Sequence, residues 1–156
     1  MSQLTREAEP AVEALLERDP DQLFAELGMR LETIQSEPSK SGQFNLVPDK
    51  SKEALGLMDE FRNIGQKYFN RVNVVAYGLV CGSDSANEKD RNALLKSFEF
   101  GSDAVAPAMA AILVGHLGLA PAIATVVALL IVKLFFRPGY DTMCEYWKSK
   151  LPERIS

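Results

Sequence analysis

The sequence predicts an all-α fold: a compact bundle of about six or seven helices with a hydrophobic helical hairpin near the C-terminus. Along most of the chain apolar residues recur every three or four positions, which is the spacing of one helix face. Prolines and glycines stand between these periodic stretches, where helices end and begin. The hairpin is expected either at the centre of the bundle or inserted in a membrane.

Residues 1–36 predict an N-terminal pair of amphipathic helices. Asp19 and Pro20 separate the two, because Asp is a preferred N-cap and Pro suits the first helical position. Residues 37–50 contain two prolines and a glycine without sustained periodicity, and we expect a linker there.

Residues 51–101 form the predicted helical body. A long helix is expected over 51–81, with a kink at Gly65 and a stop at Gly82, which tolerates the left-handed conformation. A capping box at 85–88 should open the next helix. The residues of that helix expected to face the core are Leu94, Leu95 and Phe98.

The most unusual part of the chain is residues 102–137, the predicted hairpin. From position 104 to position 136 the only ionisable side chains are His116 and Lys133. Two glycines and a proline divide this stretch, which predicts helices over 103–117 and 121–136. Their length falls between the roughly 10–14 residues typical of buried helices and the roughly 20 that span a bilayer.

The hairpin positions expected to face either lipid or the protein core are the same under both interpretations. Small residues also recur at four-residue steps, which allows helix backbones to approach closely. These small-residue rows are Ala104/Ala108, Ala111/Gly115 and Ala120/Ala124/Ala128. The candidate lipid-facing or core positions are Ala104, Ala108, Leu113, Leu117, Pro121, Val126, Leu129, Leu130, Leu134, Phe135 and Phe136.

Residues 138–156 predict a C-terminal amphipathic helix and tail. Aromatic residues beside cations are typical of a membrane interface, and Lys133, Arg137, Tyr140 and Trp147 are the candidate anchors. The alternative is an ordinary helix that closes the bundle. His116, at the bend of the hairpin, is either a turn residue bonded to a backbone carbonyl or a protonation switch for membrane entry.

The charge distribution argues against nucleic acid as a partner. The formal net charge is −4, with −6 on residues 1–103 and +2 on residues 104–156. Binding a polyanion depends on basic side chains that neutralise phosphates. An acidic body lacks that property.

No catalytic, cofactor or metal motif is evident, so we expect neither an enzyme nor a cofactor. One histidine cannot form a histidine-rich metal site, and no glycine-rich phosphate loop or nucleophile motif occurs. Carboxylates such as Glu26 and Asp59 are interpreted as solvated. Cys81 and Cys144 are interpreted as reduced core residues, typical of a reducing compartment.

Two functional hypotheses follow. In the first, a cytoplasmic helical protein engages or enters a membrane through the hairpin, singly or as a homo-oligomer, as a membrane-disrupting toxin or defence effector does. In the second, the bundle is soluble and acts as an adaptor or subunit that binds a partner protein. The N-terminus has no apolar segment typical of a secretory signal, so the expected location is cytoplasmic, with membrane association under the first hypothesis.

Overall fold

The computed structural model describes residues 3–48, 56–82 and 88–151, and within these ranges it contains seven α-helices and no strand. The predicted all-α bundle is confirmed. Short 3-10 helices, labelled η, precede α3 and α5. The bounds are α1 Gln3–Leu15, α2 Pro20–Ser36, η1 Pro38–Gly42, α3 Met58–Cys81, α4 Glu88–Ser97, η3 Phe98–Phe100, α5 Ser102–Leu117, α6 Pro121–Phe135 and α7 Tyr140–Lys150.

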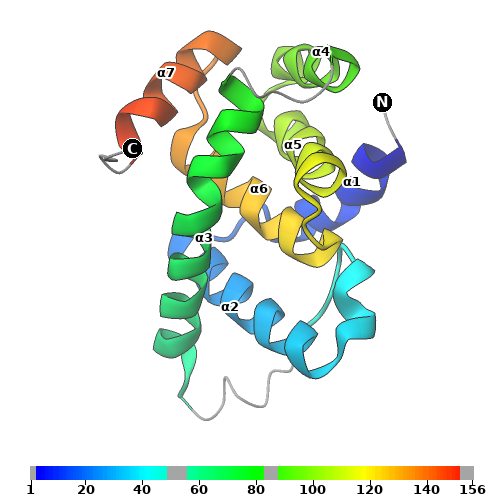
Figure 1. Cartoon of the computed structure of the whole chain (residues 1–156), viewed down its shortest axis with the longest axis vertical. Coiled ribbons are helices and arrows are strands. Elements are labelled where there is room, and N and C mark those ends of the chain that lie inside the picture. The colour runs from blue at the N-terminus through cyan, green and yellow to red at the C-terminus, as the bar shows by residue number, and fades with distance from the viewer. Residues whose placement is uncertain (1–2, 49–55, 83–87, 152–156) are drawn as a thin grey trace.

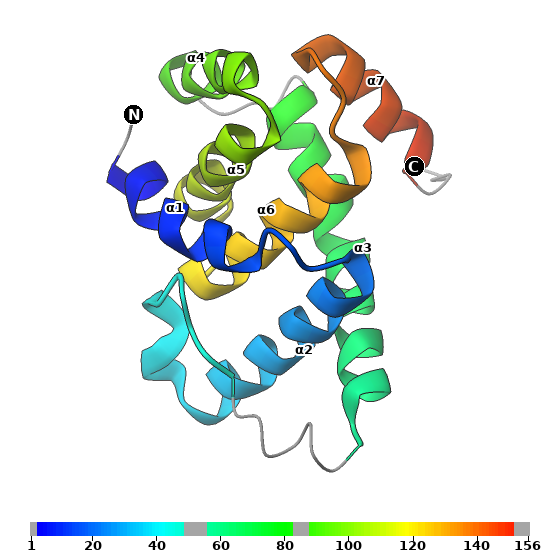
Figure 2. The same ribbon diagram turned by 180° about the vertical axis from the view of Figure 1, so that it is seen from behind.

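Helix α6 runs through the middle of the bundle, and the other helices are arranged around it (Figures 1 and 2). It packs against α5, α2 and α1, with further contacts to η1 and α7. Every residue from Ala122 to Val132 is buried by the protein itself. The hairpin therefore lies at the centre of the bundle, with bounds within one residue of those predicted at either end of each helix.

Helices α2 and α3 cross at unusually close range because a glycine stands on each side of the contact. A Cβ atom on Gly28 would lie 2.0 Å from the carbonyl oxygen of Phe61, and one on Gly65 would lie 1.9 Å from that of Phe24. No side chain fits at such distances. Helix α3 continues as a single helix through Gly65, the position at which the sequence predicts a kink, and the glycine there permits the close crossing.

The ends of two helices match the sequence prediction to different degrees. Asp19 caps α2 as predicted, and its carboxylate accepts a hydrogen bond from the Gln22 amide at 2.8 Å. Helix α3 ends before Gly82 as predicted, but the glycine is extended, with φ −93° and ψ −172°, rather than left-handed. The same helix begins at Met58 rather than at 51, and positions 51–55 and 85–87, including most of the proposed capping box, lie outside the described residues.

Helix α7 is fastened to the end of α3 by a disulfide bond between Cys81 and Cys144. The interpretation of these cysteines as reduced core residues is therefore wrong. Their separation of 63 positions in the chain concealed the pairing, because sequence spacing does not reveal which helices lie together. The bond adds a covalent link between two helices that also pack against each other.

Candidate functional site

The hairpin residues singled out in the sequence lie mostly inside the protein. Leu113, Val126, Leu129 and Leu130 are fully buried, and Ala108 and Phe135 nearly so. The remainder lie at the ends of the two helices and are partly exposed, namely Ala104, Leu117, Pro121, Leu134 and Phe136. In this structure the apolar side chains of α6 thus face other side chains of the same protein.

Two of the candidate interface anchors are engaged in contacts within the bundle. Trp147 is fully buried, stacks on Phe135 with 5.5 Å between ring centroids, and donates its indole N–H to Asn73 Oδ1 at 2.8 Å. The Tyr140 hydroxyl donates to the carbonyl oxygen of Val80 at 2.5 Å. Burial raises the pKa of Tyr140. Both aromatic residues attach α7 to the body of the protein.

The two cationic anchors also contact the protein. The Lys133 ammonium donates to the carbonyl oxygen of Leu16, at the end of α1. The Arg137 guanidinium lies 3.7 Å from the centroid of the Tyr146 ring. The four proposed anchors are therefore not gathered on one exposed face.

His116 lies in the last turn of α5 and pairs with a carboxylate rather than with a backbone carbonyl. Its Nε2 is 2.7 Å from Asp90 Oδ2 on α4. This contact joins the end of the hairpin's first helix to α4, which Arg91 also ties to the carbonyl oxygen of Gly82 at 3.1 Å. Leu94 alone of its apolar residues is fully enclosed, whereas Leu95, expected to face the core, is 38% exposed.

Sequence reasoning missed a buried ionic cluster on α2. Arg30 donates to Glu26 Oε2 at 2.8 Å, and to the carbonyl oxygens of Phe44 and Ala122 at 2.9 and 2.8 Å. Arg18 reaches the other oxygen of Glu26 at 3.1 Å. Burial lowers the pKa of Arg30, and Glu26 opposes that shift. The cluster holds α2, the segment after η1 and the start of α6 together, so Glu26 is structural rather than solvated.

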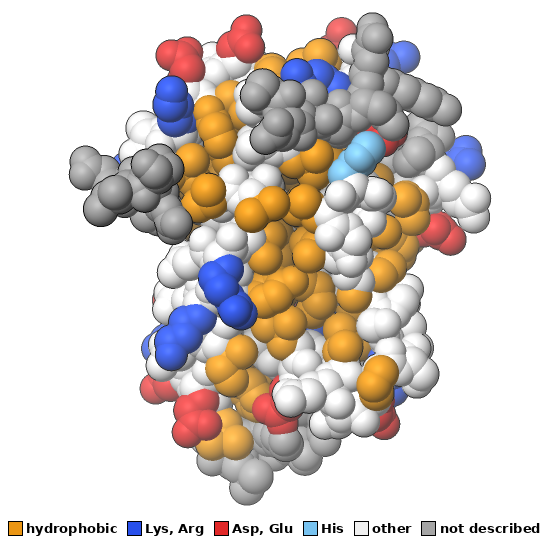
Figure 3. Space-filling model, viewed as in Figure 1, with side chains coloured by type: hydrophobic (Ala, Val, Ile, Leu, Met, Phe, Trp, Pro, Cys, Tyr) orange, Lys and Arg blue, Asp and Glu red, His pale blue; other side chains and the backbone are white. Residues whose placement is uncertain are grey.

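One exposed feature is a shallow apolar groove between α3 and the turn that joins α5 to α6. Its volume is about 370 Å³. Figure 3 shows the apolar surface of this face, bordered on one side by basic side chains. Along α3 the exposed apolar residues include Ile64 and Val75, which are 44% and 54% exposed. We call this feature the α3 groove; its lining residues are Tyr68, Arg71, Val72, Val75, Leu117 and Leu119.

The α3 groove carries positive rather than negative charge. Arg71 is its one charged lining residue, and its guanidinium lies 5.9 Å from the centroid of the Tyr68 ring. Burial raises the pKa of Tyr68, and the nearby Arg71 opposes that shift. The tyrosine therefore stays neutral at physiological pH and offers a hydroxyl at the edge of an apolar surface.

Other kinds of site find little support in the described part of the chain. No three His, Cys, Asp or Glu side chains there come together as metal ligands. Within the same residues no single helix is long and apolar enough to cross a bilayer, although α6 and α7 together meet that criterion as a pair bent by 92°. The chain matches no protein-family model, no curated protein and no solved structure.

Proposed function

We propose that this protein is a non-enzymatic helical binding module whose α3 groove receives an amphipathic helix of a partner protein. The partner helix presents an apolar face to the groove and acidic residues along its flank. This mode of recognition lays apolar side chains at helical spacing into a groove. It corresponds to an adaptor or a subunit of a larger assembly.

The proposal rests on one observation: the protein covers the apolar surface of α6 and leaves part of the apolar surface of α3 exposed to solvent. Helix α6 is enclosed by the protein's own helices, so its hydrophobicity requires no external partner. On α3 the opposite holds, because Ile64 and Val75 remain exposed on the outer face. Contiguous exposed apolar surface rimmed by polar residues is typical of an interaction site.

The dimensions and charge of the groove select the partner. The stripe from Ile64 to Val75 covers twelve residues and rises about 16 Å along the helix, which matches three turns of a partner. Arg71 stands at its edge and favours a carboxylate on the incoming helix. A basic helix would meet an uncompensated like charge at the same place.

The proposal is tested with two synthetic helical peptides that share one leucine-rich face and differ only in their flanks, glutamate or lysine. Titration into the ¹⁵N-labelled protein is followed by NMR. The glutamate-flanked peptide should shift the amides of Tyr68, Val72 and Leu117 and bind at least about tenfold tighter than the lysine-flanked one. Arg71→Glu should reverse this preference.

A matched control keeps this experiment specific. Lys148→Glu on α7 makes the same charge change at a residue that does not line the groove and should leave both affinities unchanged. Shifts confined to other elements, or equal affinity for both peptides, would contradict the proposal. Val75→Lys, on the exposed outer face, should abolish peptide binding while the protein stays folded.

Membrane insertion of the hairpin is a second candidate, and one observation favours it. Helices α6 and α7 together have the length and composition of a broken membrane span, and α7 follows α6 at a sharp bend. Insertion would require the covering helices α1 and α2 to leave α6. Flotation with anionic vesicles decides between the two: co-flotation that resists high salt supports insertion, and protein that stays at the bottom of the gradient supports the binding module.

A further inference from the structure

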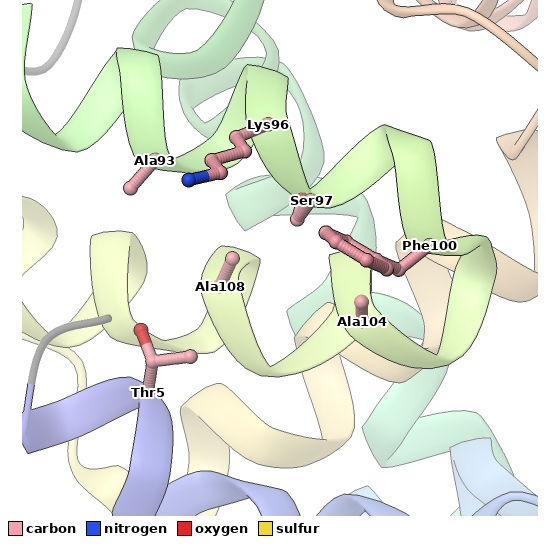
Figure 4. Close-up of a pocket in the computed structure, with 7 residues that line it drawn as sticks. All are labelled: Thr5, Ala93, Lys96, Ser97, Phe100, Ala104 and Ala108. Carbon is pink, nitrogen blue, oxygen red and sulfur yellow. The ribbon is translucent and has the colours of Figure 1, made fainter.

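A second concave site lies between α1, α4, η3 and α5, and it shares no lining residue with the α3 groove (Figure 4). Its volume is about 400 Å³. Pockets that hold small molecules have volumes of roughly 300–1,000 Å³. We call it the alanine pocket; it is lined by Thr5, Ala93, Lys96, Ser97, Phe100, Ala104 and Ala108.

The pocket exists because small side chains face each other across the contact between α4 and α5. Ala104 and Ala108 stand one turn apart on α5 and form its floor, and Ala93 faces them from α4 (Figure 4). The row Ala104/Ala108 was expected to allow close helix packing. Here the small side chains leave a space instead, toward which α4 directs Ala93, Lys96 and Ser97 and α1 directs Thr5.

One end of the alanine pocket is closed only partly. Phe100 stands there beside Ala104, in the short helix before Gly101, and it is 71% exposed. Covering so exposed a phenyl ring with an apolar ligand is favourable, because it removes apolar surface from water. The pocket thus offers an apolar path that ends on an uncovered aromatic ring.

The other end of the pocket carries a single positive charge. Figure 4 shows the Lys96 ammonium directed into the space between α4 and α5, near Ala93. Among the residues that the structure describes, no carboxylate lies within ion-pair distance of Lys96. The neighbouring Ser97 hydroxyl already donates to the carbonyl oxygen of Leu94 at 2.5 Å. Lys96 is therefore the group available to an anion.

We infer that the alanine pocket binds an anionic amphiphile with one alkyl chain, of which a fatty acid is the simplest case. The carboxylate pairs with Lys96, and the chain passes Ala108 and Ala104 to reach Phe100. A charge-assisted hydrogen bond orients the head, and burial of the chain supplies most of the affinity. One cation suits a monoanion better than a phosphate dianion, and the volume suits one chain better than two.

Dodecanoate is the probe, used below its micellar concentration with the full chain after delipidation. Isothermal titration calorimetry should give one saturable site. Dodecanol, with the same chain and no charge, should bind at least about tenfold more weakly, because it lacks the ion pair. In ¹³C-methyl spectra of alanine-labelled protein, the methyl groups of Ala104 and Ala108 should shift.

Different variants test the contact of the ligand's carboxylate and the contact of its alkyl chain. Lys96→Met should lower the affinity for dodecanoate to that for dodecanol and leave dodecanol unchanged, whereas Lys148→Met on α7 should change neither. Ala104→Leu should weaken both ligands by more than tenfold by filling the pocket. Ala93→Leu, which fills the pocket from α4, serves the same purpose if the first variant fails to fold.

Three results would overturn the inference. One is the absence of saturable binding, and another is equal affinity for dodecanoate and dodecanol. The third is methyl or amide shifts at the α3 groove in place of Ala104 and Ala108. These results are distinguishable from failure of the proposed peptide site, because the two sites have different residues and different probes.

Discussion

Helices α6 and α3 are both rich in apolar residues, but the bundle buries those of α6 and leaves some of those of α3 exposed. Helix α6 is apolar on all sides and is covered on all sides, so that Ala122 through Val132 are buried. Helix α3 has a narrower apolar surface, and part of it, at Ile64 and Val75, faces outward. The most hydrophobic of these helices is therefore the one that the protein covers most completely.

This difference teaches that the total hydrophobicity of a helix does not indicate how much of its apolar surface stays exposed in this protein. What matters is whether the surrounding elements can cover the apolar side chains. The helices around α6 are sufficient, with the Arg30 cluster and the Lys133 contact completing the enclosure at its two ends. The outer face of α3 has no such cover among the described residues.

The largest expected effect on stability comes from comparing a lysine placed on α6 with a lysine placed on α3. Leu130→Lys puts an unpaired ammonium in the centre of the bundle and should reduce the free energy of unfolding by more than about 3 kcal/mol. Val75→Lys should change it by no more than about 0.5 kcal/mol. Urea denaturation followed by circular dichroism measures both. Equal stability of the two variants would contradict the burial contrast.

The next largest effect concerns the attachment of α7 through Cys81 and Cys144. Replacing both by serine should cost about 2–4 kcal/mol, because the bond closes a long loop in the unfolded chain. Trp147, the only tryptophan in the chain, reports on this change. Its emission should shift to longer wavelength at lower urea concentration than the loss of helix. Coincident transitions at the original midpoint would show that the bond contributes little.

A smaller effect is expected at the α2–α3 crossing. Gly65→Ala forces a Cβ against the Phe24 carbonyl and should destabilise the protein by about 1–3 kcal/mol. Gly78→Ala lies on the same helix, with no atom within 4 Å of the added Cβ. It should be neutral or stabilise the protein by up to about 1 kcal/mol, because alanine favours the helix. If both variants behave alike in thermal denaturation, the close crossing is not a determinant of the fold.

The smallest effect concerns the Tyr140 hydroxyl. Tyr140→Phe removes the hydrogen bond to Val80 and should cost about 0.5–1.5 kcal/mol at neutral pH. Since burial raises the pKa of Tyr140 in the folded state, its contribution is present below the ordinary tyrosine pKa of about 10 and is lost as pH rises through the folded value. The variant should therefore lose less stability than the native chain between pH 8 and pH 11. An identical decline in the free energy of unfolding of the variant and of the native chain would exclude this contribution of Tyr140.

The sequence was sufficient to predict those parts of the fold that depend on local chemistry. Periodicity predicted the hairpin, and Asp19 with Pro20 predicted the start of α2, because capping depends on residues a few positions apart. It did not reveal the close contact at Gly65, because the decisive neighbour is Phe24 on another helix. It failed at the cysteines for the same reason, since their pairing depends on how α7 returns to α3.

The candidate sites were less predictable than the fold. The α3 groove combines residues from α3 with Leu117 and Leu119, and only the packing of the hairpin brings these together. Val72 and Val75 both fall in the long helix predicted over 51–81, and the periodicity of that stretch does not indicate which of them remains uncovered. Likewise, Ala104 and Ala108 were noted as small residues, but the space beside them depends on what α4 and α1 fail to fill.

Native-state hydrogen exchange tests most directly the claim that the protein itself shelters the hairpin. The amides of residues 122–132 should exchange only through global unfolding, with an opening free energy equal to that from urea denaturation, and anionic vesicles should not alter it. Exchange of these amides through a lower-energy opening, or a change in their protection when vesicles are added, would contradict the account.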